Sequence, residues 1–402
     1  MEKKISIKSA AVIAGAVAVI TFSATSFWAF QICNDSVAML RKKAKSIEDI
    51  YTVDQYIDEK YYGEYDEEKI IDSSLKAMVA ALDDKYSAYM TPDEYEQNLL
   101  DAKGSISGIG IVVNLTEENE IKIVDVNEEG PAKEAGLKID DVITAIDGNN
   151  VSEMEYADAV NLVRGETGTE VTLTVERGTQ QLDFTMTREE IVSQSVTSRM
   201  LENDIAYIRI TGFKENTSYQ YNVELKKCLE DGAKEIIFDL RNNGGGLVSA
   251  CSDCLDPLLP EGDIAIAEFK DGSSEVICKS DDLELDLPMA VLVNENSASA
   301  AELFAAALRD FDKAVLVGKN TFGKGIMQNT YNLDNGGGLR LTVAKYRTVK
   351  SECYHGVGLA PDYEADIPEK YAQTSIEDIP ENEDTQLQKA IEVLRQHRTI
   401  NG

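Results

Sequence analysis

Histidine is almost absent from this 402-residue chain, which has only His355 and His397. A Ser-His-Asp hydrolase would have to use one of these two residues as its base. The chain contains no His-Glu-x-x-His string, which excludes zinc proteases of that kind. If a serine is the nucleophile here, lysine is therefore the best candidate for its base.

Basic residues are also scarce. The chain has 39 Lys and Arg against 72 Asp and Glu, which gives a formal net charge of -33. Because affinity for nucleic acid comes largely from Lys and Arg on phosphates, a nucleic-acid partner is not expected. Broad contact with an anionic membrane surface is disfavoured for the same reason. Diffuse acidity of this kind is typical of a soluble surface.

Two familiar motifs are incomplete. The segment from Gly318 to Gly325 nearly spells a phosphate-binding loop, but Gly325 stands where a Ser or Thr would bind magnesium. Ser73-Ser-Leu-Lys76 fits the Ser-x-x-Lys of penicillin-recognising enzymes, yet the Ser-Asp-Asn and Lys-Thr-Gly partners are missing. Apolar residues around Ser73 recur at helical spacing, so this match is interpreted as incidental on a helix surface.

Two short blocks carry the candidate chemistry: Asn296-Ser-Ala-Ser-Ala-Ala-Glu302 and Thr321-Phe-Gly-Lys-Gly-Ile-Met-Gln328. A serine hydroxyl is a weak nucleophile and needs an adjacent base. A free lysine, with a pKa near ~10.4, is protonated at pH 7. Lowering its pKa to about 7 requires roughly 4–5 kcal/mol of destabilisation of the ammonium, normally by burial.

Lys324 suits this role because its immediate neighbours are apolar residues and glycines. Gln328 follows four positions later, which places both side chains on one face of a strand or helix. Its carbonyl oxygen could accept a hydrogen bond from the neutral amine and aim it at Ser299. The sequence predicts Ser299 as nucleophile, Lys324 as base and Gln328 as orienting residue. The alternative is that Lys324 is an ordinary loop lysine and that Ser299 is a small residue at the start of a helix.

These blocks, with Asp239-Leu-Arg-Asn-Asn-Gly-Gly-Gly246, resemble the C-terminal processing peptidases, also called tail-specific proteases. The resemblance runs from about residue 47 to residue 363, and it departs at Ala301, where the family has a third serine, and at Asn296. It implies the same three catalytic residues, Ser299, Lys324 and Gln328. It also implies an oxyanion hole formed by two backbone amides, with two further residues in support. These are Gly245 and Ala300 for the oxyanion hole, and Glu302 and Thr321 for support.

The segment from about 103 to 188 resembles a PDZ domain. It opens with Gly108-Ile-Gly-Ile-Val-Val113 and continues with Gly130-Pro-Ala-Lys-Glu-Ala-Gly-Leu137. Backbone amides near the first glycines are expected to bind the terminal carboxylate of a peptide, while the adjacent strand edge accepts its extended chain. The expected residues are Gly108, Ile109, Gly110 and Ile111. Family likeness also suggests that Arg164 contacts the catalytic core; a solvated surface arginine is the alternative.

The N-terminal segment from Ser9 to Asn34 contains no charged residue and is long enough to span a bilayer. We therefore expect an uncleaved single-pass membrane anchor with the catalytic portion outside the cytoplasm. A protein secreted after signal-peptide cleavage is the alternative. Basic residues flank the segment on both sides, so charge does not decide the orientation.

Six cysteines raise the question of disulfides and redox chemistry: Cys33, Cys228, Cys251, Cys254, Cys278 and Cys353. Cys251-Ser-Asp-Cys254 has the spacing of a redox pair. However, Cys251, Cys254 and Leu258 recur at helical intervals, which favours the buried apolar face of a helix. The disulfide state is left open by the sequence.

The sequence thus predicts a mixed α/β chain in five parts: an anchor in 1–35, a helical region in 36–102, a PDZ domain in 103–188, a peptidase core in 189–368, and an acidic linker with a C-terminal helix in 369–402. Within the core, strand-like runs alternate with helical ones, as in α/β proteins. The expected strands are 205–210, 235–240, 289–293, 314–317 and 339–344. The expected helices are 218–229 and 299–309.

The predicted function is that of a membrane-anchored serine endopeptidase that recognises the free C-terminus of protein or peptide substrates and needs no metal or cofactor. Homodimerisation is a further implication of the family likeness. The first alternative is a PDZ adaptor or regulator on a protease-like core that does not cleave. A redox protein using Cys251 and Cys254 is the second.

Overall fold

The computed structural model describes residues 7–116, 119–127, 129–372 and 374–401; for some helical residues, most of them in the first helix, it describes the backbone alone. The chain divides into two units, residues 1–71 and 72–402. In the first, helix α1 spans Ile7–Lys60. No helix has a stretch long and apolar enough to cross a membrane among the residues whose side chains are described. The predicted anchor, 9–32, lies mostly outside those residues.

Helix α2 (Glu67–Ala80) follows. It contains Ser73 and Lys76, and the Lys76 ammonium pairs with Glu94 at 2.7 Å. The penicillin-enzyme motif is therefore an incidental match on a helix, as predicted. Strand β1 (Ala88–Met90), helix α3 (Pro92–Lys103) and strand β2 (Ser105–Gly108) come next.

A small β-rich domain follows, with its own apolar core. Its sheet has the order β3-β4-β5-β7-β8, with β6 paired to β5. The chain then leaves through β9 (Glu189–Val192), which pairs antiparallel with β2. The elements are β3 (Ile111–Leu115), β4 (Ile121–Val126), α4 (Pro131–Ala135), β5 (Val142–Ile146), β6 (Asn149–Asn150), the 3-10 helix η1 (Val151–Glu153), α5 (Tyr156–Val163), β7 (Glu170–Arg177) and β8 (Gln180–Thr187).

The larger domain is built on a sheet of order β10-β11-β12-β15-β16-β19, in which all pairs are parallel except β10 with β11. Every residue of β11, β12 and β15 is buried, as expected for parallel strands covered on both faces. The strands are β10 (Val196–Leu201), β11 (Ile205–Ile210), β12 (Glu235–Asp239), β15 (Met289–Val293), β16 (Ala314–Gly318) and β19 (Tyr363–Glu364).

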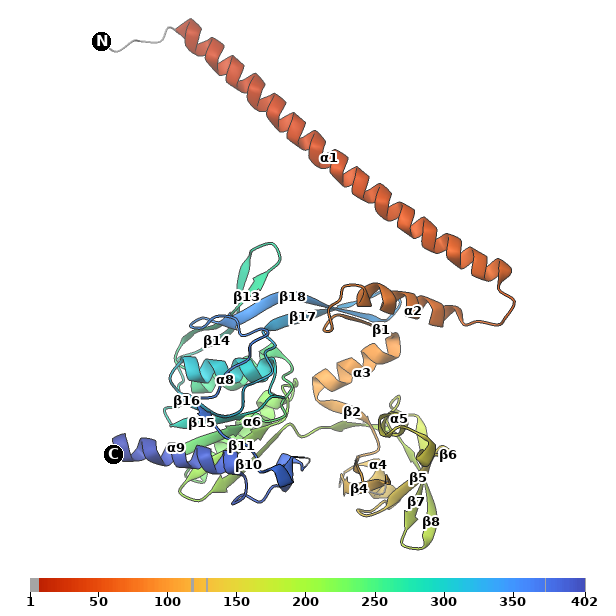
Figure 1. Ribbon diagram of the computed structural model, residues 1–402, viewed down its shortest axis with the longest axis vertical. Helices are drawn as coiled ribbons and strands as arrows, with labels where there is room; N and C mark the ends of the chain where they lie inside the picture. The colour runs from red at the N-terminus through yellow and green to blue at the C-terminus, as the bar shows by residue number, and fades with distance from the viewer. Residues whose placement is uncertain (1–6, 117–118, 128, 373, 402) are drawn as a thin grey trace. The chain divides into compact units, whose positions relative to one another are not determined.

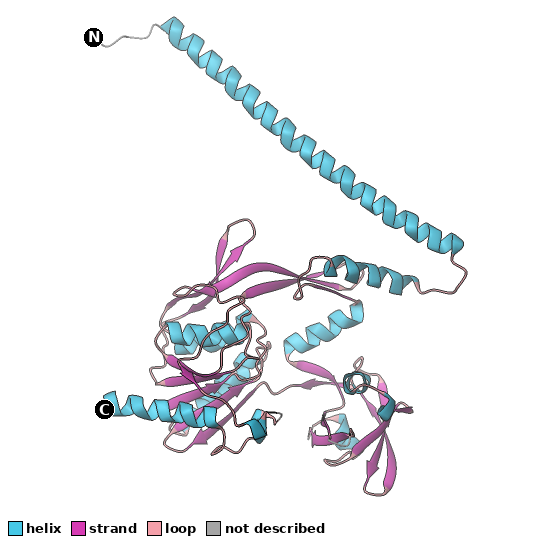
Figure 2. Ribbon diagram, viewed as in Figure 1, coloured by secondary structure: helices cyan, strands magenta, loops and turns pink. Residues whose placement is uncertain are grey.

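A second sheet has the order β1-β18-β13-β14, with β17 on the β18 strand. Helices α6, α7 and α8 share one apolar core with both sheets, whereas α9 packs on the opposite face of the first sheet (Figures 1 and 2). The strands are β13 (Gly262–Phe269), β14 (Ser274–Ser280), β17 (Ile326–Asn332) and β18 (Gly338–Thr348). The helices are α6 (Thr217–Glu230), α7 (Val248–Leu255), η2 (Asp256–Leu258), α8 (Ala300–Asp310), η3 (Glu369–Tyr371), η4 (Ile376–Asp378) and α9 (Thr385–Asn401).

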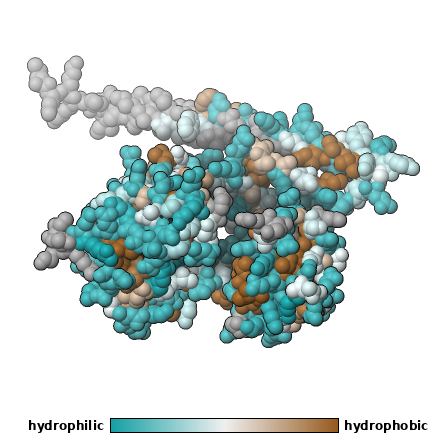
Figure 3. Space-filling model, turned by 60° about the horizontal axis from the view of Figure 1, so that its bottom comes forward, coloured by the Kyte–Doolittle hydropathy of each residue, from teal (hydrophilic) through white to brown (hydrophobic). Residues whose placement is uncertain are grey.

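The mixed α/β fold is confirmed, and each predicted strand and helix of the core corresponds to an observed element. The predicted acidic linker was wrong in one respect, because part of it packs on the core. Ile376 and Ile379 are buried there, and Glu377 pairs with Arg209 at 2.6 Å. On the face seen in Figure 3, the described residues are mostly hydrophilic, with hydrophobic side chains gathered in a few patches.

The cysteines that the structure describes are all free thiols. Cys251 and Cys254 lie on the buried face of α7, which confirms the interpretation of their spacing as helical. Burial raises the pKa of both thiols well above the ordinary value. Since the thiolate is the reactive form, this environment disfavours redox chemistry at the pair.

A buried ionic network ties the end of β12 to the start of α9. Arg241 is fully buried and lies 2.6 Å from Asp239 and 2.8 Å from Asp384. The Tyr207 hydroxyl donates a 2.6 Å hydrogen bond to Asp239. Burial acts to raise the pKa of Asp239, but Arg241, Arg209 and Tyr207 together outweigh it, so the net shift of that pKa is downward. The network fixes the loop that follows β12, which carries the glycines of the candidate site.

Replacing Arg241 by Met should destabilise the fold by about 3–5 kcal/mol, because it leaves buried carboxylates without their main partner. The measurement is the free energy of unfolding in urea. Lys234→Met is the matched control, since its pair with Asp204 is largely exposed and is worth about 1 kcal/mol or less. Equal stability of the two variants would contradict this account of the network.

Candidate active site

Ser299 lies directly before helix α8, in the loop that follows the carboxyl end of the parallel strand β15. Its backbone has φ 57° and ψ −119°, a conformation rarely adopted by residues other than glycine. Such strain persists only where the surroundings over-determine it, and it is common at functional sites. The side chain is half-buried, at the edge of the helix N-terminus.

The carboxylate of Glu302 fixes that backbone. It is completely buried and accepts hydrogen bonds from the Ser299 amide at 2.9 Å and the Lys324 amide at 2.7 Å. It also accepts bonds from the Gly323 amide at 2.7 Å and the Thr321 hydroxyl at 2.5 Å. One side chain therefore joins the serine block to the lysine block, as the supporting roles predicted for Glu302 and Thr321 require.

Lys324 lies in the loop between β16 and β17 and is half-buried. Burial lowers the pKa of its ammonium, and the positive charges of Arg340 and Lys85 lower it further. The carboxylates of Asp84 and Glu302 act in the opposite direction. The net shift is downward, which is the direction that a lysine base needs.

The hydrogen bonds of the described residues do not join the Ser299 hydroxyl to the Lys324 amine. Gln328, on β17, donates to the Ile326 carbonyl and the Thr342 hydroxyl, both at 3.4 Å. The Glu302 carboxylate thus brings the backbones of Ser299 and Lys324 together, while the Gln328 amide is engaged with other partners. Apo forms of catalytic sites often show such loose geometry.

His355 offers no better base. His355 is exposed, and within the described part of the chain it makes no hydrogen bond to Ser299. The side chain of His397 lies outside the described residues.

The glycine loop after β12 lies against the serine. A side-chain carbon at Gly245 would come within 2.8 Å of both the Ala300 nitrogen and Ser299 Cβ, so only glycine fits. Ala300 is the first residue of α8, where the amide has no acceptor within the helix. The Gly245 amide, the other predicted oxyanion donor, instead donates to Asn243 Oδ1 at 2.8 Å. It would have to exchange this partner in order to bind an oxyanion.

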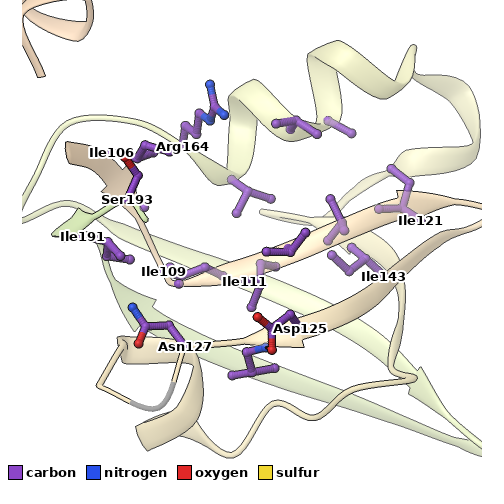
Figure 4. A pocket seen from close by; sticks show the side chains of 18 of the residues that line it. Ile106, Ile109, Ile111, Ile121, Asp125, Asn127, Ile143, Arg164, Ile191 and Ser193 are labelled. Atoms are coloured by element: carbon purple, nitrogen blue, oxygen red, sulfur yellow. The ribbon is translucent and has the colours of Figure 1, made fainter. Parts of the chain in front are cut away.

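The small domain carries a groove of about 840 Å³ between β3 and α5 (Figure 4). Gly108, Ile109, Gly110 and Ile111 are among its lining residues. Their predicted binding of a peptide terminus stays a prediction. Gly110 has φ 80°, a left-handed conformation that glycine adopts without strain. The other lining residues are mainly apolar, including Val113, Ile121, Ile143, Ala159, Val160 and Val163.

Arg164 is exposed and lies at the end of this groove near Ile106 and Ser193 (Figure 4). Among the described residues it has no ion pair or hydrogen bond with the core. The predicted contact between Arg164 and the catalytic core therefore stays a prediction.

Comparison with known proteins places this geometry in a family. The probable CtpA-like serine protease of Staphylococcus saprophyticus is 34% identical over 374 residues, covering 92% of this chain and 74% of the relative. The carboxy-terminal processing protease CtpA of Bacillus subtilis is 36% identical over 311 residues, covering 77% and 66%. The chain belongs to the C-terminal processing peptidase family.

Family profiles agree with the two domains seen in the structure. Peptidase family S41 matches residues 204–365, and the PDZ domain matches residues 122–177. A third profile, the N-terminal domain of the activating protease CtpB, matches residues 15–94. Among solved structures, a putative S41 protease from Bacteroides fragilis has 20% identity and a TM-score of 0.53, covering 84% of this chain and 91% of that one. That likeness shows the fold alone. This peptidase is thus a serine-type enzyme with a PDZ domain.

Two residues of the peptidase site were missed by sequence reasoning. Tyr346, on β18, is buried and donates a 3.0 Å hydrogen bond to the Lys324 carbonyl. Burial raises its pKa, while the Tyr354 and Ser299 hydroxyls act to lower it. Asn243 holds the glycine loop through its bond to Gly245. Neither residue stands out in the sequence, because Tyr346 is one of 17 tyrosines and Asn243 is part of an ordinary Asn-Asn pair.

Glu302→Gln should lower kcat/KM by about 100-fold or more, because an amide cannot accept all four hydrogen bonds and the nucleophile and base would be misplaced. Glu295→Gln, at an exposed position four residues before Ser299, is the matched control and should keep full activity. Near-normal activity of the Glu302 variant would contradict the central role of this carboxylate.

Arg340→Met should raise the pKa of Lys324, since it removes a positive charge that lowers it. A lysine base works only when neutral, so the acidic limb of the pH profile should move to higher pH. On that limb kcat/KM should fall by roughly two- to fivefold, with little change at high pH. The check is kcat/KM from pH 5 to 10. A shift of the limb in the opposite direction would show that Arg340 does not act through this charge.

Proposed function

We propose that this chain is a serine endopeptidase that binds the free C-terminal tail of a protein substrate in its PDZ groove and hydrolyses a peptide bond by a Ser-Lys mechanism assisted by Gln328. The observation that carries the proposal is the Glu302 carboxylate, which holds the backbones of Ser299 and Lys324 together. The lowered pKa of Lys324 supports its role as the base.

In this mechanism the neutral Lys324 amine removes the proton from the Ser299 hydroxyl as its oxygen attacks the substrate carbonyl carbon. The tetrahedral oxyanion is stabilised by the Ala300 amide and, after release from Asn243, by the Gly245 amide. The Lys324 ammonium then donates its proton to the leaving amine, which breaks the peptide bond. Water, deprotonated by the same lysine, hydrolyses the acyl-enzyme and restores the serine. Gln328 orients the neutral amine during both steps.

Tail recognition rests on the groove of the PDZ domain. Its apolar lining suits the side chains near a peptide terminus, and the glycine-bounded backbone at its end suits the terminal carboxylate. An extended peptide that adds to β3 would gain main-chain hydrogen bonds, while the apolar lining would select small apolar side chains. Arg164, exposed at the mouth of the groove, is positioned to meet either the bound tail or the core.

We propose a location outside the cytoplasm, with the N-terminal segment as a single-pass anchor and secretion after cleavage as the alternative. The support is the charge-free run from Ser9 to Asn34. Homodimerisation is proposed from family likeness. The chemistry described for Ser299 and Lys324 requires no metal or cofactor.

Cleavage of an unfolded reporter that ends in small apolar residues tests the function. The full chain should cleave it, and Ser299→Ala and Lys324→Ala should each lower kcat at least 1,000-fold, as expected when a nucleophile or its base is removed. A reporter with an amidated C-terminus should be cleaved more slowly, mainly through a higher KM.

Cleavage that survives in the Ser299 variant would refute the dyad. Equal cleavage of the free and amidated reporters would refute tail recognition but leave the Ser-Lys dyad standing. Binding of the free tail without cleavage by any form would favour the alternative, a PDZ adaptor on a protease-like core.

A further inference from the structure

The amine of Lys324 rests on an aromatic ring. Its Nζ atom lies 4.7 Å from the centroid of the Tyr86 ring, within the range of a cation–π contact. Within the described part of the chain, Lys324 Nζ has no ion pair and no hydrogen bond. Tyr86 belongs to the segment before the PDZ domain, more than 200 residues away in sequence, and none of the roles assigned so far uses it.

The backbone that carries the Tyr86 ring is held in place by its own segment. The Tyr86 amide donates to Asp84 Oδ1 at 3.0 Å, and the Ser87 hydroxyl donates to Asp84 Oδ2 at 2.6 Å. Ser87 Oγ in turn accepts the Thr342 amide of β18 at 3.1 Å. The three residues after Ser87 form β1, which pairs antiparallel with β18. In this pairing Ala88 lies opposite Arg340. The backbone around Tyr86 is therefore tied to β18, the strand whose Thr342 hydroxyl also accepts a hydrogen bond from Gln328.

Charged groups approach Lys324 from each element around it. Arg340 lies on β18, Lys85 and Asp84 lie beside Tyr86, and Glu302 lies on α8. Lys85 Nζ lies 4.9 Å from the centroid of the same Tyr86 ring and 5.0 Å from that of Phe322, two residues before Lys324. Burial and the two cations disfavour a proton on Lys324. The Tyr86 ring acts in the opposite direction, because the negative face of an aromatic ring attracts an ammonium and not a neutral amine.

A ring with this preference gives the two protonation states of Lys324 different preferred positions. The ammonium gains from contact with Tyr86. The neutral amine gains nothing there and is free to turn to a hydrogen-bonding partner. Ser299 supplies such a partner, because the Glu302 carboxylate holds its backbone beside that of Lys324. Loss of the proton and arrival at the nucleophile would then occur together.

We propose that Tyr86 is a positioning residue for Lys324, whose ring retains the ammonium form and releases the neutral amine toward Ser299. This inference rests on the proposed function, in which Lys324 is the base. It assigns a role in the chemistry to the segment that precedes the PDZ domain.

The test compares three substitutions in the full chain. Tyr86→Phe keeps the ring, Tyr86→Leu keeps apolar bulk without a ring, and Tyr86→Trp supplies the strongest aromatic partner. On the acidic limb of the pH profile, the Leu variant should raise kcat/KM by roughly two- to fivefold and the Trp variant should lower it, while Phe matches the parent. At high pH, where lysine is neutral in every variant, the four forms should converge.

A second readout does not depend on cleavage. In the Ser299→Ala background, the rate at which acetic anhydride acetylates Lys324 is measured by mass spectrometry across pH, relative to an exposed lysine such as Lys226. Below the midpoint of its titration, Lys324 should react roughly two- to fivefold faster with Leu at position 86 than with Tyr or Phe.

Equal acetylation of the Leu and Phe forms, or faster reaction of the Trp form, would overturn the proposal. The Trp and Leu variants act in opposite directions, so if one of them fails to fold the other still decides. Failure of the proposed function would give a different result. Cleavage would then persist in Ser299→Ala, while the acetylation rates of the residue 86 variants would still differ as expected.

Discussion

The Glu302 carboxylate is the constraint on which this peptidase depends. It is fully buried, and its charge is compensated by four donors from the backbones and side chains of two distant loops. A buried carboxylate is stable only with such partners, so the loops cannot separate without a large free-energy cost. The same bonds hold Ser299 in its strained backbone conformation. Fold stability and the geometry of the nucleophile are thus maintained by one group.

Around this centre, four parts of the chain converge at the edge of the catalytic domain. The glycine loop after β12 reaches Ser299 and is held from behind by the Arg241 network with α9. The loop before β17 brings Lys324, and the strand β18 brings Tyr346 and Arg340. The segment before the PDZ domain adds Tyr86 through the pairing of β1 with β18. The glycine loop contacts the serine, whereas β18 and the segment before the PDZ domain supply the groups around Lys324.

Much of this arrangement could be predicted from the sequence, for identifiable reasons. The strands of the parallel sheet are continuous apolar runs, so they could be recognised from their composition and length. The serine and lysine blocks could be recognised because each is a compact motif. Tyr86, Tyr346 and Asn243 could not be predicted in the same way. Their roles depend on contacts with residues that lie between 2 and more than 200 positions away in the sequence. No sequence pattern around a tyrosine or an asparagine indicates such a contact. The Gly245 amide illustrates a second limit: a motif indicates which group is present but not which partner it holds in a given conformation.

The chain enters the PDZ domain through β2 and leaves through β9, and these two strands pair with each other. The ends of the inserted domain are therefore held together by this pairing, so the insertion forms a closed loop on the catalytic domain. The entropy of closing that loop depends only weakly on what lies within it, so the domain between the strands can lengthen, shorten or be exchanged with little effect on the folding of the remainder. The PDZ domain and the catalytic domain can in this sense vary independently. A change within the PDZ domain would leave in place the hydrogen bonds by which Glu302 holds the backbones of Ser299 and Lys324.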